Sequence, residues 1–76
     1  MDEIERIILH KLSLYESLTP IELWYEIGED PALEETLTKE EISSRLESLR
    51  AQGLVERLTE AEGGIRWALK RGDANQ

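Results

Sequence analysis

The stretch from Leu46 to Gly72 constrains the fold of this 76-residue chain most strongly. A helical pattern ends at Gly53, LVERLT and IRWALK have the pattern of short strands, and EAEGG supplies a turn between them. Glycine commonly closes a helix in the left-handed conformation, and tight hairpins also need it. When a helix runs through a glycine directly into a two-stranded ribbon, the ribbon can pack back over the hydrophobic core. The order therefore predicts a C-terminal hairpin that shares one hydrophobic core with the preceding helices.

Three helix starts upstream of this hairpin carry the same capping signal. In each, a residue that can accept a backbone hydrogen bond is followed three positions later by a glutamate; the pairs are Asp2 and Glu5, Thr19 and Glu22, and Thr38 and Glu41. Pro20 strengthens the second start, since proline is favoured in the first helical position. The predicted helices cover residues 3–15, 20–28 and 39–52.

Apolar residues of the first and third predicted helices recur on one face. The first helix stacks Ile4, Ile7, Ile8, Leu12 and Tyr15, the third buries Ile42, Leu46 and Leu49, and the second strand aligns Ile65, Trp67 and Leu69. Lys11 falls within the first stripe, where its amine is expected to reach water past the apolar side chains.

The second predicted helix is apolar around much of its circumference. Ile21, Leu23, Trp24, Tyr25 and Ile27 spread over roughly 200° at 100° per residue. Two interpretations stay open: the other helices cover this surface completely, or part of Trp24 or Tyr25 is exposed as an interface anchor, a role in which such residues are enriched. The loop from 28 to 37 that follows is long for a helix connection, and unusually long loops are often functional.

Charge is distributed unevenly along the chain. The formal net charge is −8, and all of it lies in residues 1–36, which hold ten acids and two bases, whereas residues 37–76 hold seven of each. An acidic protein repels phosphate at long range, so nucleic-acid binding is expected only in the C-terminal half. No cysteine is present, which excludes disulfides and thiolate metal sites.

The pattern ISSRLESLRAQGLVERL, a glycine-containing turn and IRWALKRG resembles the third helix and wing of winged helix-turn-helix domains, in particular MarR-type and related prokaryotic transcriptional regulators. The resemblance is clearest from Thr38 to Gly72. It implies a small α+β fold with a three-helix core and a C-terminal β-hairpin wing, to which residues 17–19 add a short strand. We expect a single domain over residues 1–71 with a disordered tail at 72–76. The loop before the third helix is longer than in that family, and these 76 residues are not expected to include the helix that follows the wing and makes the dimer there.

The resemblance implies binding of double-stranded DNA as a small transcriptional regulator, with the third helix in the major groove. A homodimer would then read two half-sites. The candidate DNA-binding residues are Lys39, Ser43, Ser44, Arg45, Arg50, Arg57, Arg66, Lys70 and Arg71. The outermost face of that helix, however, carries Glu40, Ser44, Glu47, Ser48 and Ala51, and the wing tip carries Glu60 and Glu62.

Two alternatives to DNA contact follow from this chemistry. The arginines can pair within the domain, Arg45 and Arg50 with Glu41 and Glu47 at helical spacings and Arg57 across the hairpin, while Lys70 and Arg71 solubilise the end of a strand. The competing class of function is a protein-interaction module, whose acidic surface and apolar helix face would bind a protein partner instead of nucleic acid. Its candidate interface residues are Trp24, Tyr25, Glu29, Asp30, Glu34 and Glu35.

Catalysis is not expected. His10 is the only histidine, lies off the apolar stripe and has no predicted partner, so neither a catalytic triad nor a metal site can be assembled around it. Gly63 and Gly64 belong to a hairpin turn and not to a phosphate-binding loop, which leaves no cofactor expected. No apolar run approaches the roughly 20 residues that span a bilayer, so we expect a cytoplasmic protein without membrane contact.

Overall fold

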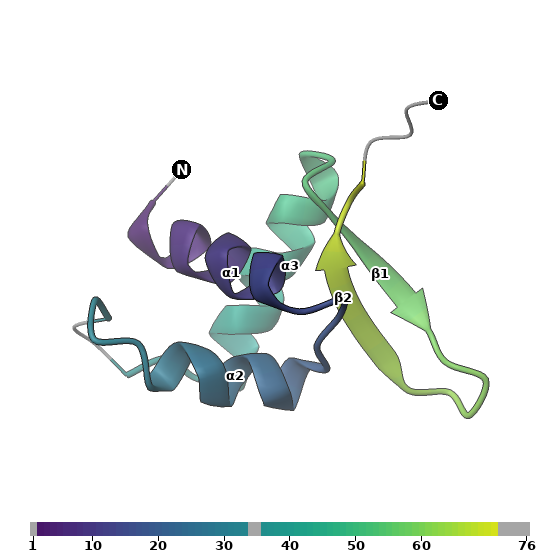
Figure 1. The fold of residues 1–76 in the computed structure, drawn as a ribbon, viewed down its shortest axis with the longest axis horizontal. Helices are drawn as coiled ribbons and strands as arrows, with labels where there is room; N and C mark the ends of the chain where they lie inside the picture. Colours follow the sequence, from purple (N-terminus) through teal and green to yellow (C-terminus); the bar gives the residue numbers. More distant parts are fainter. Residues whose placement is uncertain (1, 34–35, 72–76) are drawn as a thin grey trace.

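The computed structural model describes residues 2–33 and 36–71, and within them three helices precede one antiparallel hairpin (Figure 1). The elements are α1 (Glu3–Leu14), α2 (Pro20–Gly28), α3 (Lys39–Ala51), β1 (Val55–Thr59) and β2 (Ile65–Leu69). The predicted α+β layout of a three-helix core with a C-terminal hairpin is confirmed, and it is compatible with a winged helix. The predicted tail at 72–76 lies outside the described residues.

Local capping explains where each helix begins. At α2 and α3 the predicted capping boxes are complete: the hydroxyls of Thr19 and Thr38 each accept a backbone N–H at 3.1 Å, and Glu22 and Glu41 each accept the threonine's own N–H at 2.9 Å. At α1 the prediction is half right. Asp2 caps the helix, but the Glu5 carboxylate lies near an arginine of α3 instead.

Gly53 ends α3 as the sequence predicts. Its φ of 80° lies in the left-handed region, where a side chain would be strained. The N–H of Gly53 then donates to Arg50 O and the N–H of Leu54 to Leu49 O, which is the double hydrogen bond of a Schellman motif. The chain therefore turns directly from α3 into β1, and the hairpin packs beside the helix that precedes it.

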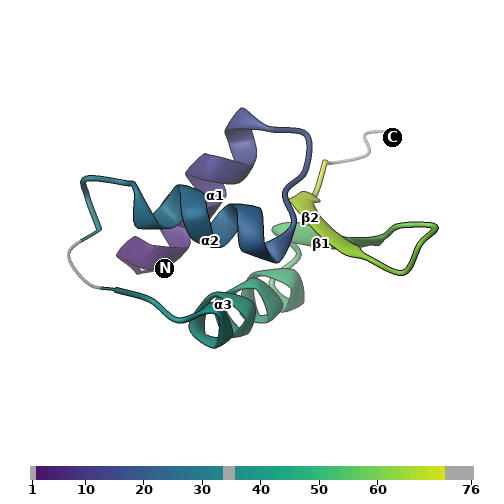
Figure 2. The same ribbon diagram turned by 90° about the horizontal axis from the view of Figure 1, so that it is seen from below.

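A backbone bridge pairs the connection between α1 and α2 with the hairpin. Leu18 forms a β-bridge with Trp67, through N–H to O hydrogen bonds of 2.9 and 2.7 Å in the two directions. The predicted third strand at 17–19 is thus wrong in extent, because Pro20 has no N–H and α2 begins immediately after Thr19. This bridge nevertheless attaches the hairpin to the connection between the helices. The tip of the hairpin extends beyond the three helices (Figure 2).

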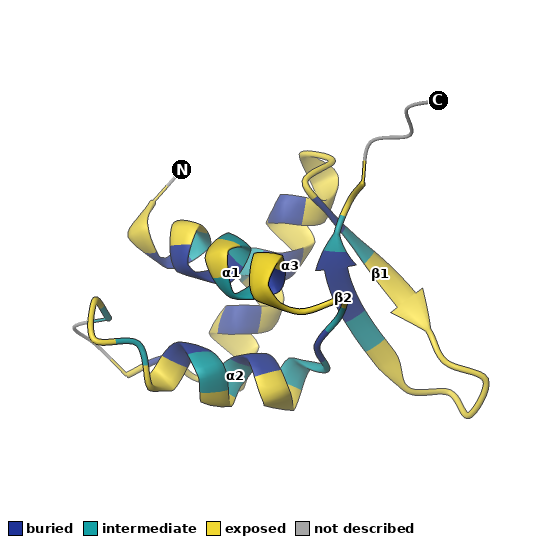
Figure 3. Ribbon diagram, in the orientation of Figure 1, coloured by how far each residue is buried: buried dark blue, intermediate teal, exposed yellow. Residues whose placement is uncertain are grey.

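A single core fills the space between the helices and the base of the hairpin (Figure 3). Its largest fully buried side chains are Ile8, Leu12, Leu23, Ile27, Ile42, Leu46, Leu49 and Val55. Two predicted core positions are wrong. Tyr15 is 41% exposed because α1 ends at Leu14 and Tyr15 continues in an extended conformation, and Ile65 is exposed because it lies near the tip of the hairpin.

Over the part of the chain that the structure describes, no helix is long and apolar enough to cross a bilayer.

Leu46→Ala is expected to lower the free energy of unfolding by about 3 kcal/mol, because it leaves a cavity at a position with no solvent exposure. Urea unfolding followed by circular dichroism measures this loss. Leu58→Ala, on the exposed side of the hairpin, is the matched control and should cost less than about 1 kcal/mol. Equal losses in the two variants would contradict the assignment of Leu46 to the core.

Candidate functional site

Arg45 of the predicted DNA-binding set faces α1. Its guanidinium pairs with Asp2, the N-cap of α1, and lies 3.9 Å from Glu5 Oε2. The predicted pairing of Arg45 with Glu41 is therefore wrong, since the side chain turns toward a neighbouring helix and not along its own. Asp2 and Glu5 place two carboxylates around this one cation.

Arg50 and Arg57 share a single carboxylate. Arg50 Nε lies 3.2 Å from Glu47 Oε1, as the helical spacing predicts, and Arg57 Nη1 lies 3.5 Å from Glu47 Oε2. Arg57 thus pairs with α3 and not across the hairpin, because it lies on the same face of the hairpin as buried Trp67. The negative charge of the Glu47 carboxylate therefore lies between the guanidiniums of Arg50 and Arg57.

Arg66 joins the hairpin to the start of α2. Its guanidinium donates to Ser17 Oγ at 2.7 Å and to Ser17 O at 3.0 Å. Glu22 Oε1 and Glu60 Oε2 lie 3.5 and 3.7 Å away. Both hydrogen bonds and both carboxylates come from the same domain, so Arg66 fixes the bridge between the hairpin and the helices.

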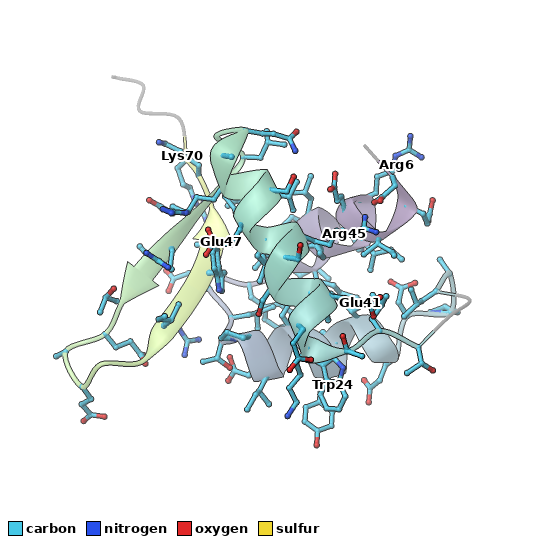
Figure 4. The ribbon with its side chains drawn as sticks, turned by 180° about the vertical axis from the view of Figure 1, so that it is seen from behind. Arg6, Trp24, Glu41, Arg45, Glu47 and Lys70 are labelled. Atoms are coloured by element: carbon cyan, nitrogen blue, oxygen red, sulfur yellow. The ribbon has the colours of Figure 1, made fainter. Side chains whose placement is uncertain are left out.

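The basic residues do not form one ridge over α3 and the hairpin. Arg45 and Glu47 point to opposite sides of α3, toward α1 and toward the hairpin respectively (Figure 4). The other members of the predicted set are exposed: Lys39, Ser43 and Ser44 at the start of α3, and Lys70 and Arg71 after β2. DNA binding by this set of residues stays a prediction.

The outer side of α2 is apolar and exposed. Tyr25 is 63% and Ile21 is 53% exposed, so of the two interpretations of this helix the one in which its surface is fully covered is wrong. Trp24 beside them is partly buried, and its indole N–H donates to Leu37 O at 2.8 Å. The Trp24 and Tyr25 rings lie 5.3 Å apart at a tilt of 60°, a favourable edge-to-face type of contact.

A groove of about 430 Å³ opens beside these aromatic rings. We call it the α2 groove; its apolar walls are Trp24, Tyr25 and Ile27 from α2, Leu33 and Leu37 from the loop that follows, and Ile42 from α3. Glu29 lies on its rim, and Lys39 Nζ lies 5.2 Å from the centre of the Trp24 ring, within the range of a cation–π contact. The groove has the size and apolar lining of a binding site.

The loop that builds one wall of the groove is tied to α1. Lys11 Nζ lies 3.4 Å from Asp30 Oδ2, and both side chains are only about 15% exposed. Lys11 therefore pairs with a carboxylate instead of reaching free water as predicted. The N–H of Ala32 donates to Asp30 Oδ1 at 2.8 Å, and this hydrogen bond, with the charge of Lys11, lowers the pKa of Asp30.

The predicted acidic interface is divided by this arrangement. Asp30 is occupied by Lys11, Glu29 is exposed at the groove, and Glu34 and Glu35 lie outside the described residues. On the side of α2 that faces the end of α1, the charge of Glu26 raises the pKa of the Tyr15 phenol.

Sequence reasoning missed Ile21, Leu33, Leu37 and the position of Lys39 as parts of this surface. A signal existed for Ile21 alone, because it lies on the helical wheel next to Tyr25. Leu33 and Leu37 lie in a loop without periodicity, and the contact between Lys39 and Trp24 joins two elements that only tertiary structure brings together.

Comparisons of the chain with protein-family models, with curated proteins and with solved structures find no match.

Replacing Glu47 should release two guanidiniums at once. We expect Glu47→Gln to bind a random-sequence DNA duplex at low salt more tightly than Glu40→Gln, which changes the net charge equally and lies on the same exposed face of α3. Fluorescence anisotropy measures the difference. Equal affinities for the two variants would show that Glu47 does not keep Arg50 and Arg57 from phosphate.

Asp30→Asn tests the attachment of the loop, because asparagine keeps an acceptor for Ala32 N–H and removes the charge that faces Lys11. The folded pKa of Asp30 is lowered, so its carboxylate stabilises the fold above the ordinary pKa of about 3.9 and loses this effect as the pH falls through the folded value. The variant should unfold at lower urea than the native protein at neutral pH, and the difference should shrink in acid. Glu62→Gln at the hairpin tip serves as the control, and a difference independent of pH would contradict the expectation.

Proposed function

We propose that this chain is a winged-helix protein-interaction module without catalytic activity, and that α2 and the α2 groove form its binding surface. The observation that carries the proposal is the exposed pair Ile21 and Tyr25 beside an apolar groove. Large apolar side chains exposed next to a concave surface are typical of protein interfaces, and tyrosine is enriched at the residues that dominate binding energy.

The charges of the domain also favour a protein partner. The four arginines Arg45, Arg50, Arg57 and Arg66 each lie near at least one carboxylate of the same domain. Phosphate would have to displace those carboxylates against a net charge of −8. A protein ligand of α2 requires no such displacement.

DNA binding as a transcriptional regulator is the second candidate, and one observation favours it. Lys39, Ser43 and Ser44 are exposed at the N-terminal end of α3, the end that recognition helices present to the major groove. Relation to MarR-type regulators belongs to this candidate, as does a homodimer on two half-sites. A cytoplasmic location is common to both candidates and stays a prediction.

The first experiment places a photo-crosslinking amino acid at position 25, and separately at position 58 on the hairpin, in cells that produce the chain. We expect position 25 to capture a specific protein that position 58 does not capture. The captured protein is then purified and titrated against the native chain, against Tyr25→Ala and against Leu58→Ala. Tyr25→Ala should weaken binding by about tenfold or more, the scale of a hot-spot residue, and Leu58→Ala should not.

The competing outcome is equally specific. Equal binding by Tyr25→Ala and the native chain would reject α2 as the interface. Salt-sensitive binding of the native chain to a random-sequence duplex, lost in Arg50→Ala/Arg57→Ala but kept in Tyr25→Ala, would favour the DNA candidate.

A further inference from the structure

We propose that the α2 groove binds a basic segment of the partner protein, with an apolar side chain of that segment in the groove and a lysine or arginine over the Trp24 ring in place of Lys39. This inference rests on the proposed function and adds to it the chemistry of the partner. Three features of the groove carry it: its shape, its charge and the contact between Lys39 and Trp24.

The shape of the groove suits one side chain of an extended or helical segment. Ile27, Leu37 and Ile42 are buried at its base, whereas Trp24 and Leu33 are partly exposed and Tyr25 is largely exposed above them. An apolar side chain that enters this space gains contact with both α2 and the loop. Peptide grooves commonly recognise a partner through such anchors.

The charge around the groove selects a basic partner. The described residues of α2 and the following loop include four acids, Glu22, Glu26, Glu29 and Asp30, of which Glu22 lies near Arg66 and Asp30 near Lys11. Among them Glu29 lines the groove and is exposed. A second copy of this chain would bring the same acidic surface to the interface and be repelled, whereas a lysine- or arginine-rich segment is attracted.

Lys39 shows that the Trp24 ring can accommodate a cation. Its amine lies 5.2 Å from the ring centre, and Lys39 is exposed at the first position of α3. The contact uses a flexible side chain at the surface, where such interactions are weak. A cation from a partner anchored in the groove can therefore replace it without disturbing the core.

The test selects short random peptides displayed on phage against the native chain, and discards those that still bind Tyr25→Ala. We expect the remaining peptides to combine an aromatic or aliphatic anchor with two or more basic residues. Their affinity, measured by anisotropy of the labelled peptide, should fall as salt increases.

Two pairs of variants with matched charge then separate specific recognition from general attraction. Glu29→Gln should weaken peptide binding by about threefold relative to Glu62→Gln, the scale of one exposed charge pair. Lys39→Gln should strengthen it by about threefold relative to Lys70→Gln, because it removes the competing cation from Trp24. The urea midpoints of all four variants verify that each is folded.

Each other outcome overturns a defined part of the inference. Peptides that depend on Tyr25 but lack basic residues, or that are indifferent to Glu29→Gln and Lys39→Gln, would reject the basic segment and leave the interaction module standing. If no selected peptide depends on Tyr25, the result would count against both the basic segment and the proposed interaction surface on α2. Sedimentation that reveals a dimer lost in Tyr25→Ala would identify a second copy of the chain as the occupant.

Discussion

The hydrogen-bonded pair of Leu18 and Trp67 determines how the hairpin sits against the helices. Both residues are buried, and their two backbone hydrogen bonds are the β-bridge that joins the connection between α1 and α2 to the hairpin. Because successive side chains of a strand point to opposite faces, Trp67 in the core places Arg66 on the other face, beside Ser17. The same alternation and register place Arg57, opposite Trp67, toward Glu47 of α3. One bridge thus sets the positions of two arginines that a DNA-binding wing would present outward.

These ion pairs oppose DNA binding through their arrangement more than through their strength. Exposed pairs contribute less than about 1 kcal/mol each, so a phosphate can in principle displace a carboxylate from an arginine. At Glu47, however, the displaced carboxylate remains between Arg50 and Arg57 and repels the phosphate that either of them binds. The repulsion between Glu47 and an approaching phosphate therefore persists after its ion pairs with Arg50 and Arg57 have broken.

The sequence was sufficient to predict features that depend on neighbours along the chain. The capping boxes at Thr19 and Thr38 and the left-handed Gly53 involve residues within five positions of one another, and all three formed as predicted. Features that depend on tertiary packing were not predictable in this way. Arg45 pairs across 43 residues with Asp2, and no spacing rule distinguishes that partner from Glu41.

The surface of α2 illustrates the same limit. Its apolar residues are compatible with complete burial or with an interface, and the choice depends on what packs around the helix. Here α1 and α3 cover the side of Leu23 and Ile27, and no other described element covers Ile21 and Tyr25. The candidate site on this helix was therefore predictable as one of two alternatives, and its groove was not predictable.

The length of the loop after α2 has a structural role in that groove. Asp30 starts a turn that is anchored to α1 through Lys11, so the chain leaves the end of α2 at a fixed position. It returns to α3 with Leu37 O held by the indole of Trp24, which places Leu37 in the floor of the groove, while Leu33 forms its outer wall. The tight turn typical of helix-turn-helix motifs has too few residues to reach both anchors and supply both leucines. The residues that lengthen this loop beyond such a tight turn are thus the ones that build a wall beside the Trp24 and Tyr25 rings of α2.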